Sequence, residues 1–293
     1  MICITGAGGT VGSEILGLLE RRRIRFRAAF FSAAKAKAAA ARGIDAATID
    51  YRQPATLAAA FQGCDAVFLL APQAVDQESL ERNAVEAAAG AGVRRIVKQS
   101  VVGAADEGYR LARVHRAVER AIEDSGMAWT FLRPNSFMQN TAGFMAPAIR
   151  AGSTFYSASG QARIAHVDVR DIAAVAVAAL AGGHEGQAYT LTGPEALCWD
   201  EVAAELSRAL GRAIAHVDLP PEALRAGMHA AGMPAAIADQ LLDLQRWFRE
   251  GGADATSDDI RRVTGSAPRR FADYARETAA TGMWDADPGP ATG

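Results

Sequence analysis

The sequence predicts an α/β fold: a doubly wound parallel sheet of the Rossmann-like type, with a smaller, mainly helical C-terminal lobe. Over the first two-thirds of the chain, short apolar runs alternate with longer Ala-rich periodic segments, which is typical of a parallel sheet covered by helices on both faces. A glycine-rich segment connects the first apolar run directly to the first periodic one. The length of 293 residues exceeds a typical single domain and leaves room for the added lobe.

The alternating part contains short apolar strands and longer helices. Several of the helices are followed by glycine, which favours the left-handed backbone found at helix C-termini. The expected strands are Ile2–Thr5, Phe26–Phe30, Ala46–Ile49, Ala66–Leu70, Arg95–Lys98 and Trp129–Leu132. The expected helices are Val11–Arg22, Ala33–Arg42, Pro54–Phe61, Gln77–Gly90 and Arg110–Ser125.

Beyond Pro134 the alternation loosens, and the segment from Pro220 to about Ala280 is expected to be mainly helical. Residues 1–150 are assigned to the sheet domain, and later segments up to about residue 219 are expected to complete its sheet. Residues 151–284 are assigned to the smaller lobe, which consists mainly of residues 195–284. The tail 285–293 is rich in Pro and Gly without periodicity and is expected to be disordered. The expected elements are a strand at Arg163–His166, a helix opened by Asp168 or Asp171, strands at Ala188–Leu191 and Ile214–Val217, and a helix at Asp200–Leu210.

The composition is that of a globular protein and excludes several other classes, and we expect the protein to be located in the cytoplasm. The 31 Lys and Arg against 33 Asp and Glu give a net charge of −2, which leaves no basic excess for nucleic-acid phosphates. Cys3, Cys64 and Cys198 are too scattered for a disulfide framework or a zinc site, and the five histidines lack metal-ligand spacing. Met1 leads straight into an apolar strand, so no signal peptide is expected. The longest apolar stretch, Ile172–Ala181, is too short to span a bilayer. We therefore expect no metal, no nucleic acid and no membrane.

The glycine-rich turn carries the first functional signal. Gly6, Gly9 and Gly12 stand in a GxxGxxG spacing after the first strand and open a helix. In such a turn one glycine allows the tight bend, one lets a pyrophosphate approach the backbone, and one permits close packing of the helix on the strand. The N–H groups of Gly9, Thr10 and Val11 would then face phosphate from the helix N-terminus. The pattern predicts dinucleotide binding; the alternative is a purely structural turn.

The end of the second strand normally reads the adenosine ribose of a bound dinucleotide. An acidic residue there favours NAD, whereas basic residues favour the 2′-phosphate of NADP. The segment 30–37 holds no carboxylate, but it offers the hydroxyl of Ser32 and the ammonium group of Lys35. NADP(H) is therefore favoured over NAD(H), unless the lysines are merely solvated helix residues.

Further motifs resemble one known family. They are the Gly6–Gly12 turn, Asp50-Tyr51, Leu70-Ala71-Pro72, His115–Glu119, Thr130–Asn140 and Val167–Ala173. Over roughly Ile2 to Ala280 the chain resembles the NmrA-like family of atypical short-chain dehydrogenases/reductases. Within that family it is most similar to the branch of triphenylmethane reductase and NAD(P)H:quinone oxidoreductase type 2. The resemblance implies a Rossmann-like fold, an NAD(P) cofactor and oxidoreductase activity.

The resemblance also implies places for cofactor-binding residues. It sets Asp50 and Tyr51 at the adenine and the segment Leu70, Ala71 and Pro72 along the ribose and pyrophosphate. Pro134 and Asn135 would lie near the nicotinamide, and Ser100 near the substrate, where it is a candidate catalytic residue. Each has a plainer reading: Asp50 caps a turn, Pro72 ends a strand, and Asn135 caps the next helix.

The chain departs from typical short-chain dehydrogenases at the catalytic helix. Those enzymes use a Tyr with a Lys four residues on, because the Lys lowers the pKa of the phenol that exchanges a proton with a carbonyl. Here the helix carries His115 and Glu119 instead. Ordinary carbonyl–alcohol chemistry with that dyad is therefore not expected. His115 is a candidate proton donor, and the alternative is a buried, hydrogen-bonded histidine.

Two function classes fit these features. The first is an NAD(P)H-dependent reductase that transfers hydride to a conjugated acceptor such as a quinone, a dye or an imine, with Phe137, Met138 and Trp247 as candidate pocket residues. Such acceptors need no strong protein acid, because the product anion is stabilised or the substrate is already cationic. The second is a non-catalytic redox sensor that binds the dinucleotide. The expected partner is an aromatic or conjugated small molecule, and a homodimer is compatible with the sequence.

Overall fold

The structure is a computed structural model that describes residues 1–285, so all of the expected disordered tail except Asp285 lies outside the described residues. The chain divides into two compact units, each assembled from separate stretches of sequence. The first contains Met1–Pro134, Val169–Leu191 and Asp259–Ser266. The second contains Asn135–Asp168, Thr192–Asp258 and the described residues from Ala267 onward. The two units are therefore interleaved along the chain.

The first unit is built on a seven-stranded sheet in which every neighbouring pair is parallel. The strand order reverses at β1, which lies between β2 and β4, and ligands bind at the carboxyl edge beside such a reversal. In sheet order the strands are β3 (Asp45–Thr48), β2 (Phe26–Phe30), β1 (Ile2–Ile4), β4 (Ala66–Leu69), β5 (Arg95–Gln99), β6 (Ala128–Pro134) and β8 (Gln187–Leu191).

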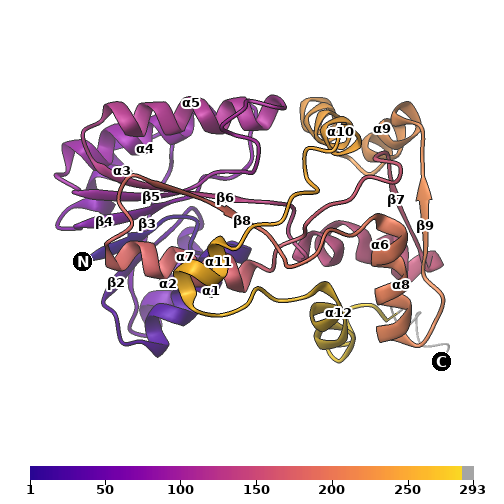
Figure 1. The fold of residues 1–293 in the computed structure, drawn as a ribbon. Helices are drawn as coiled ribbons and strands as arrows, with labels where there is room; N and C mark the ends of the chain where they lie inside the picture. Colours follow the sequence, from indigo (N-terminus) through magenta and orange to yellow (C-terminus); the bar gives the residue numbers. More distant parts are fainter. Residues whose placement is uncertain (286–293) are drawn as a thin grey trace. The chain divides into compact units, whose positions relative to one another are not determined.

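Helices cover both faces of this sheet, as Figure 1 shows. One face carries α3 (Pro54–Phe61), α4 (Gln77–Gly90) and α5 (Arg110–Asp124). The other carries α1 (Thr10–Arg21), α2 (Ala33–Ala41), α7 (Val169–Ala181) and α11 (Asp259–Thr264). Because both faces are covered, a central strand such as β4 reads as four consecutive buried apolar residues.

The predicted α/β fold is confirmed. All the strands and helices expected before Pro134 are present, and their ends lie within two residues of the predicted ones. The later helix and strand that return to the sheet are α7 and β8. The sequence signals are reliable in this part because each helix has one apolar face to bury and each buried strand stands out as a short apolar run.

The second unit differs more from the expectation. Its sheet has two parallel strands, β7 (Thr154–Ser157) and β9 (Ala215–Asp218), and the sequence analysis missed β7. The expected strand at Arg163–His166 is wrong: that segment makes only an isolated bridge between Ile164 and Leu197. The helical elements are the π-helix Thr141–Met145, α6 (Ala146–Gly152), α8 (Trp199–Leu210), α9 (Pro221–Ala230), α10 (Ala235–Arg249) and α12 (Phe271–Ala279).

Among residues 1–285 no helix combines the length and apolar character required to cross a bilayer. The same residues contain no cluster of three or more His, Cys, Asp or Glu side chains that could hold a metal ion.

An unusual histidine lies in the core of the second unit. His166 is 2% exposed, and its ring centroid lies 4.9 Å from the ring of Trp199. Neither ring nitrogen of His166 has a hydrogen-bond partner among the described residues. Burial without a partner disfavours the charged imidazolium and lowers the pKa of His166 to about 3.

We predict that His166 makes the fold acid-sensitive. Its folded pKa lies below that of the unfolded chain, about 6.5, so its stability contribution is present above pH 6.5 and is lost as the pH falls toward 3. At pH 5 the loss should be about 2 kcal/mol. His166→Phe should lose less stability than wild type between pH 7 and pH 5 in urea unfolding. His229→Gln, at an exposed site on α9, is the control and should behave as wild type.

Candidate cofactor-binding site

The glycine-rich turn lies at the carboxyl end of β1, and two of its glycines cannot be replaced without displacing backbone. Gly6 has φ +62°, in the left-handed region that favours glycine. A Cβ on Gly12 would lie 2.1 Å from the carbonyl oxygen of Gly6, far inside van der Waals contact. Gly6 therefore makes the bend, and Gly12 allows helix α1 to start directly against it.

The turn leaves an open helix N-terminus. No side chain caps α1, and the N–H groups of Thr10 and Val11 have no acceptor among residues 1–285. Gly9 differs from the expectation, because its N–H donates to the Gly6 carbonyl at 2.9 Å and so closes the turn itself. A Cβ on Gly9 would touch only that carbonyl, at 3.3 Å, and the residue is exposed. Unpaired N–H groups beside an exposed glycine fit a phosphate group.

Lys35 and Ser32 lie next to this turn. Ser32 is the N-cap of α2, and its hydroxyl accepts from the backbone N–H of Lys35 at 3.3 Å. The ammonium group of Lys35 donates to the carbonyl oxygen of Gly8 at 3.3 Å. An exposed cation therefore lies between the carboxyl end of β2 and the glycine turn.

The residues after β3 form local anchors. The Asp50 carboxylate accepts from the backbone N–H of Arg52 and the amide of Gln53, both at 2.9 Å, which is the geometry of a turn cap. Tyr51 is 4% exposed, and its hydroxyl donates to the carbonyl oxygen of Leu70 at 2.8 Å. The contacts of Asp50 match its plainer reading as a turn cap, and the adenine contacts of Asp50 and Tyr51 stay predictions.

The loop after β4 is held from several directions. The backbone N–H of Leu70 donates to the hydroxyl of Thr5 at 2.9 Å, and the N–H of Ala71 donates to the Glu81 carboxylate at 3.3 Å. Pro72 follows as an exposed residue. The loop is thus fixed beside the glycine turn, since a Cβ on Gly6 would lie 3.0 Å from the Leu70 carbonyl oxygen.

A buried ion pair lies beneath this loop. Lys98 of β5 and Glu81 of α4 are both 0% exposed, with Nζ and Oε2 2.7 Å apart. The Lys98 ammonium also donates to the carbonyl oxygen of Gln99 at 2.6 Å and lies 3.1 Å from Nδ1 of His115. The ammonium group therefore has one carboxylate, one carbonyl oxygen and one imidazole nitrogen as close neighbours. This group joins α4, β5 and α5 at the carboxyl edge of the sheet.

His115 is a member of that buried group. It is 4% exposed, and burial, followed by the nearby Lys98 charge, lowers the pKa of His115 well below its usual value. Its Nδ1 therefore accepts from Lys98, and the ring proton lies on Nε2. Gln77 lies 3.5 Å from Nε2, and its Oε1 has no partner among the described residues, so turning the amide gives that proton an acceptor. This geometry argues against His115 as a proton donor near neutral pH.

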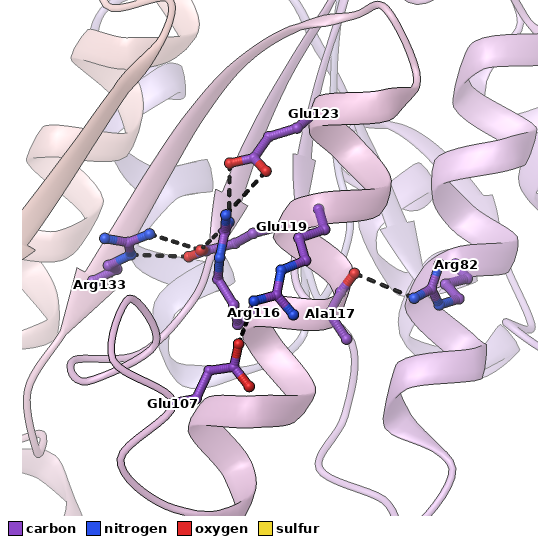
Figure 2. A network of polar contacts seen from close by, with 8 residues as sticks. Arg82, Glu107, Arg116, Ala117, Glu119, Glu123 and Arg133 are labelled. Carbon is purple, nitrogen blue, oxygen red and sulfur yellow. Dashed lines mark hydrogen bonds and ion pairs between the residues drawn. The ribbon is translucent and has the colours of Figure 1, made fainter.

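Glu119, four residues after His115, joins α5 to β6. Figure 2 shows its carboxylate between two guanidinium groups. Arg133 binds it with two hydrogen bonds, of 3.0 and 2.7 Å, and Arg116 with one of 3.1 Å. Burial raises the pKa of Glu119, but the hydrogen bonds from Arg133 and the charges of Arg133 and Arg116 outweigh burial and lower it. Ser100 is 1% exposed, and its hydroxyl has no hydrogen-bond partner among the described residues, so its role near a substrate stays a prediction.

The remaining candidates are mostly packing residues. Pro134 ends β6, and its carbonyl oxygen accepts from Val102 at 2.9 Å. In the second unit, Asn135 is 2% exposed and bonds to the carbonyl oxygen of Ala253 at 2.9 Å. Met138 and Trp247 are buried there, whereas Phe137 is half-buried. Of the three predicted pocket residues, only Phe137 keeps part of its side chain accessible.

The second unit also holds a Ser–His–Asp chain. Nε2 of His216 lies 2.8 Å from the hydroxyl of Ser157, and Nδ1 lies 2.8 Å from a carboxylate oxygen of Asp200. These are the distances of a hydrolytic triad. Ser157, however, is 2% exposed, and a nucleophile must reach its substrate. The three hydrogen-bonded side chains therefore serve to join β7, β9 and α8.

Sequence reasoning missed Lys98, Glu81 and Gln77. One signal was available: Lys98 directly follows the apolar pair Ile96–Val97 in β5, and a lysine within a parallel strand covered on both faces requires a buried partner. The identity of that partner cannot be read from the sequence, because several acidic residues occur on the surrounding helices.

Comparisons with known proteins show which family the chain belongs to. A family model described as NAD(P)H-binding matches residues 6–182. The NAD(P)H azoreductase of Xenophilus azovorans is 40% identical over 96% of this chain and 98% of its own length. An Escherichia coli NADPH-dependent quinone oxidoreductase complexed with NADPH has a TM-score of 0.86 at 30% identity, covering 95% of this chain and 99% of that one. Citrobacter sp. triphenylmethane reductase complexed with NADP(H) has a TM-score of 0.85 at 26% identity, covering 95% and 100%. The chain therefore belongs to the NAD(P)H-binding, NmrA-like family of atypical short-chain dehydrogenases/reductases, and it is an NAD(P)H-dependent oxidoreductase.

Proposed function

We propose that this protein reduces a conjugated small molecule, of the quinone, dye or iminium type, with hydride from NADPH. The observation that carries the proposal is the pairing of an open phosphate site with a catalytic helix that offers no accessible acid. Thr10 and Val11 present free N–H groups, whereas His115 and Glu119 are buried and engaged. An acceptor that needs only a well-placed hydride fits such a site.

Different residues of the chain would hold different parts of the cofactor. The N–H groups of Thr10 and Val11 hold the pyrophosphate, and the exposed Gly9 lets it approach. The Leu70–Pro72 loop, fixed by Thr5 and Glu81, supports the ribose. The bound nicotinamide supplies the hydride chemistry. The proton that completes reduction of a quinone or dye comes from water, because no protein acid near neutral pH reaches the edge from α5.

The test is steady-state oxidation of NADPH against a panel of quinones, azo dyes, triphenylmethane dyes and iminium salts, with simple ketones as the contrast. We expect turnover with conjugated acceptors and none with ketones. Tight dinucleotide binding without turnover across the panel would favour a redox sensor instead. Turnover limited to ketones would contradict the proposal.

We predict that Lys35 sets a preference for NADPH over NADH. A well-placed charge-assisted hydrogen bond to phosphate contributes about 1.5–3 kcal/mol, so Lys35→Ala should weaken NADPH binding roughly tenfold or more and leave NADH nearly unchanged. Lys37→Ala, on the same exposed helix, is the matched control and should change neither. Fluorescence titration with both reduced cofactors gives the two dissociation constants. An equal loss for both would show that Lys35 does not contact the 2′-phosphate.

A further inference from the structure

Phe31 is an aromatic side chain left in water at the carboxyl end of β2. It is 71% exposed, whereas its neighbour Phe30 is 7% exposed. Leaving a phenylalanine side chain in solvent forgoes about 1.5–3 kcal/mol of burial. Single exposed apolar residues are ordinary, so the exposure becomes informative only through its place in the fold.

Phe31 belongs neither to the strand pairing of β2 nor to helix α2. The last β2–β3 pair is Phe30 with Thr48, and Ile49 then donates to the Phe30 carbonyl at 2.8 Å. Helix α2 begins at Ala33, capped by Ser32. Phe31 therefore lies in the bend between strand and helix, beyond the ladder and before the first helical turn.

That bend lies beside the glycine turn. The N–H of Ala7 donates to the carbonyl oxygen of Ala29 at 3.3 Å, which ties the turn to β2. A Cβ on Gly8 would lie 3.4 Å from the Phe30 ring and 3.0 Å from the side chain of Lys35. Two neighbours of Phe31 along the chain thus contact the loop that precedes the open end of α1.

A dinucleotide whose pyrophosphate lies at the N-terminus of α1 extends its adenosine half toward the end of β2. The adenine ring is flat and apolar on both faces, and it stacks well on an aromatic ring. An exposed phenyl group at this place offers such a face, and the Lys35 ammonium nearby offers a charge for the ribose phosphate.

We propose that Phe31 is the stacking platform for the adenine ring of the cofactor. This inference rests on the proposed function, since it needs the dinucleotide at this edge. It assigns adenine affinity to Phe31 and phosphate preference to Lys35. The two contributions are separable, because stacking is indifferent to the 2′-phosphate and the charge contact is not.

The experiment divides the cofactor into its two halves. Reduced nicotinamide mononucleotide lacks the adenine, and adenosine 2′,5′-bisphosphate lacks the nicotinamide. Affinities of both halves, and of NADPH and NADH, are measured for wild type, Phe31→Ala and Phe31→Trp by direct titration and by displacement of NADPH fluorescence. Tyr156→Ala, an exposed aromatic on β7 of the second unit, is the control.

In Phe31→Ala we expect NADPH, NADH and the bisphosphate to bind about 5- to 150-fold more weakly, the range of one base–aromatic stack. Binding of the mononucleotide should not change. Phe31→Trp should bind NADPH, NADH and the bisphosphate as wild type does. Unchanged NADPH affinity, or an equal loss for both halves, would overturn the proposal. Failure of the proposed function looks different: wild type would bind NADPH without reducing any acceptor, and the half-cofactor comparison would still apply.

Discussion

Dinucleotide binding is expected to be lost in both Gly9→Val and Gly12→Val, but only Gly12→Val should also destabilise the fold. In Gly12→Val the new Cβ would lie 2.1 Å from the Gly6 carbonyl oxygen, so the turn must move away from helix α1. Forced packing of this kind typically costs about 1–3 kcal/mol and sometimes more. At Gly9 the side chain projects into the space expected for phosphate, and its only close contact is at 3.3 Å.

The measurements are the free energy of unfolding in urea and the dissociation constant for NADPH. We expect affinity losses above about 100-fold for both variants, since each removes most of the pyrophosphate contribution, while only Gly12→Val shows lower stability. Gly17→Ala is the matched control on the same helix, where the new Cβ meets only the flexible end of Arg21. It should bind normally and gain up to about 1 kcal/mol. Normal NADPH binding by folded Gly9→Val would contradict the phosphate site.

The GxxGxxG spacing predicted the turn, its strand and its helix, because those features depend on local backbone geometry. It did not separate the roles of the three glycines. Gly9 was expected to aim its N–H at phosphate, yet that N–H closes the turn on Gly6. Which donor is used internally depends on the path of a few backbone atoms, and the sequence pattern does not resolve it.

Side-chain roles at the sheet edge were harder to predict than the fold. His115 and Ser100 stand where the family resemblance suggests chemistry, and both are buried, His115 against the ammonium group of Lys98 from another element. The sequence shows the type and spacing of residues on one helix, but not which distant residue fills the space beside them. Lys98 comes from β5 and Arg133 from β6, far along the chain from α5.

Lys98→Met should be among the most damaging single substitutions in the first unit. It leaves the Glu81 carboxylate, which is 0% exposed, without its cation, and breaking a buried ion pair from one side typically costs about 3–5 kcal/mol. Replacing both partners with apolar residues removes that uncompensated charge. Lys98→Met/Glu81→Leu should therefore recover stability to within about 1–2 kcal/mol of wild type in urea unfolding.

The double variant also separates the two causes that act on His115. Burial remains, but the neighbouring charge of Lys98 is gone, so the pKa of His115 should rise toward its ordinary value. A folded pKa depressed below the unfolded one costs stability as the pH falls below about 6.5, and a smaller depression costs less. The double variant should thus lose less stability than wild type between pH 7 and pH 5, and titration of the His115 ring by NMR should show the rise directly. If neither changes, Lys98 does not act on His115, and the buried group only holds α4, β5 and α5 together.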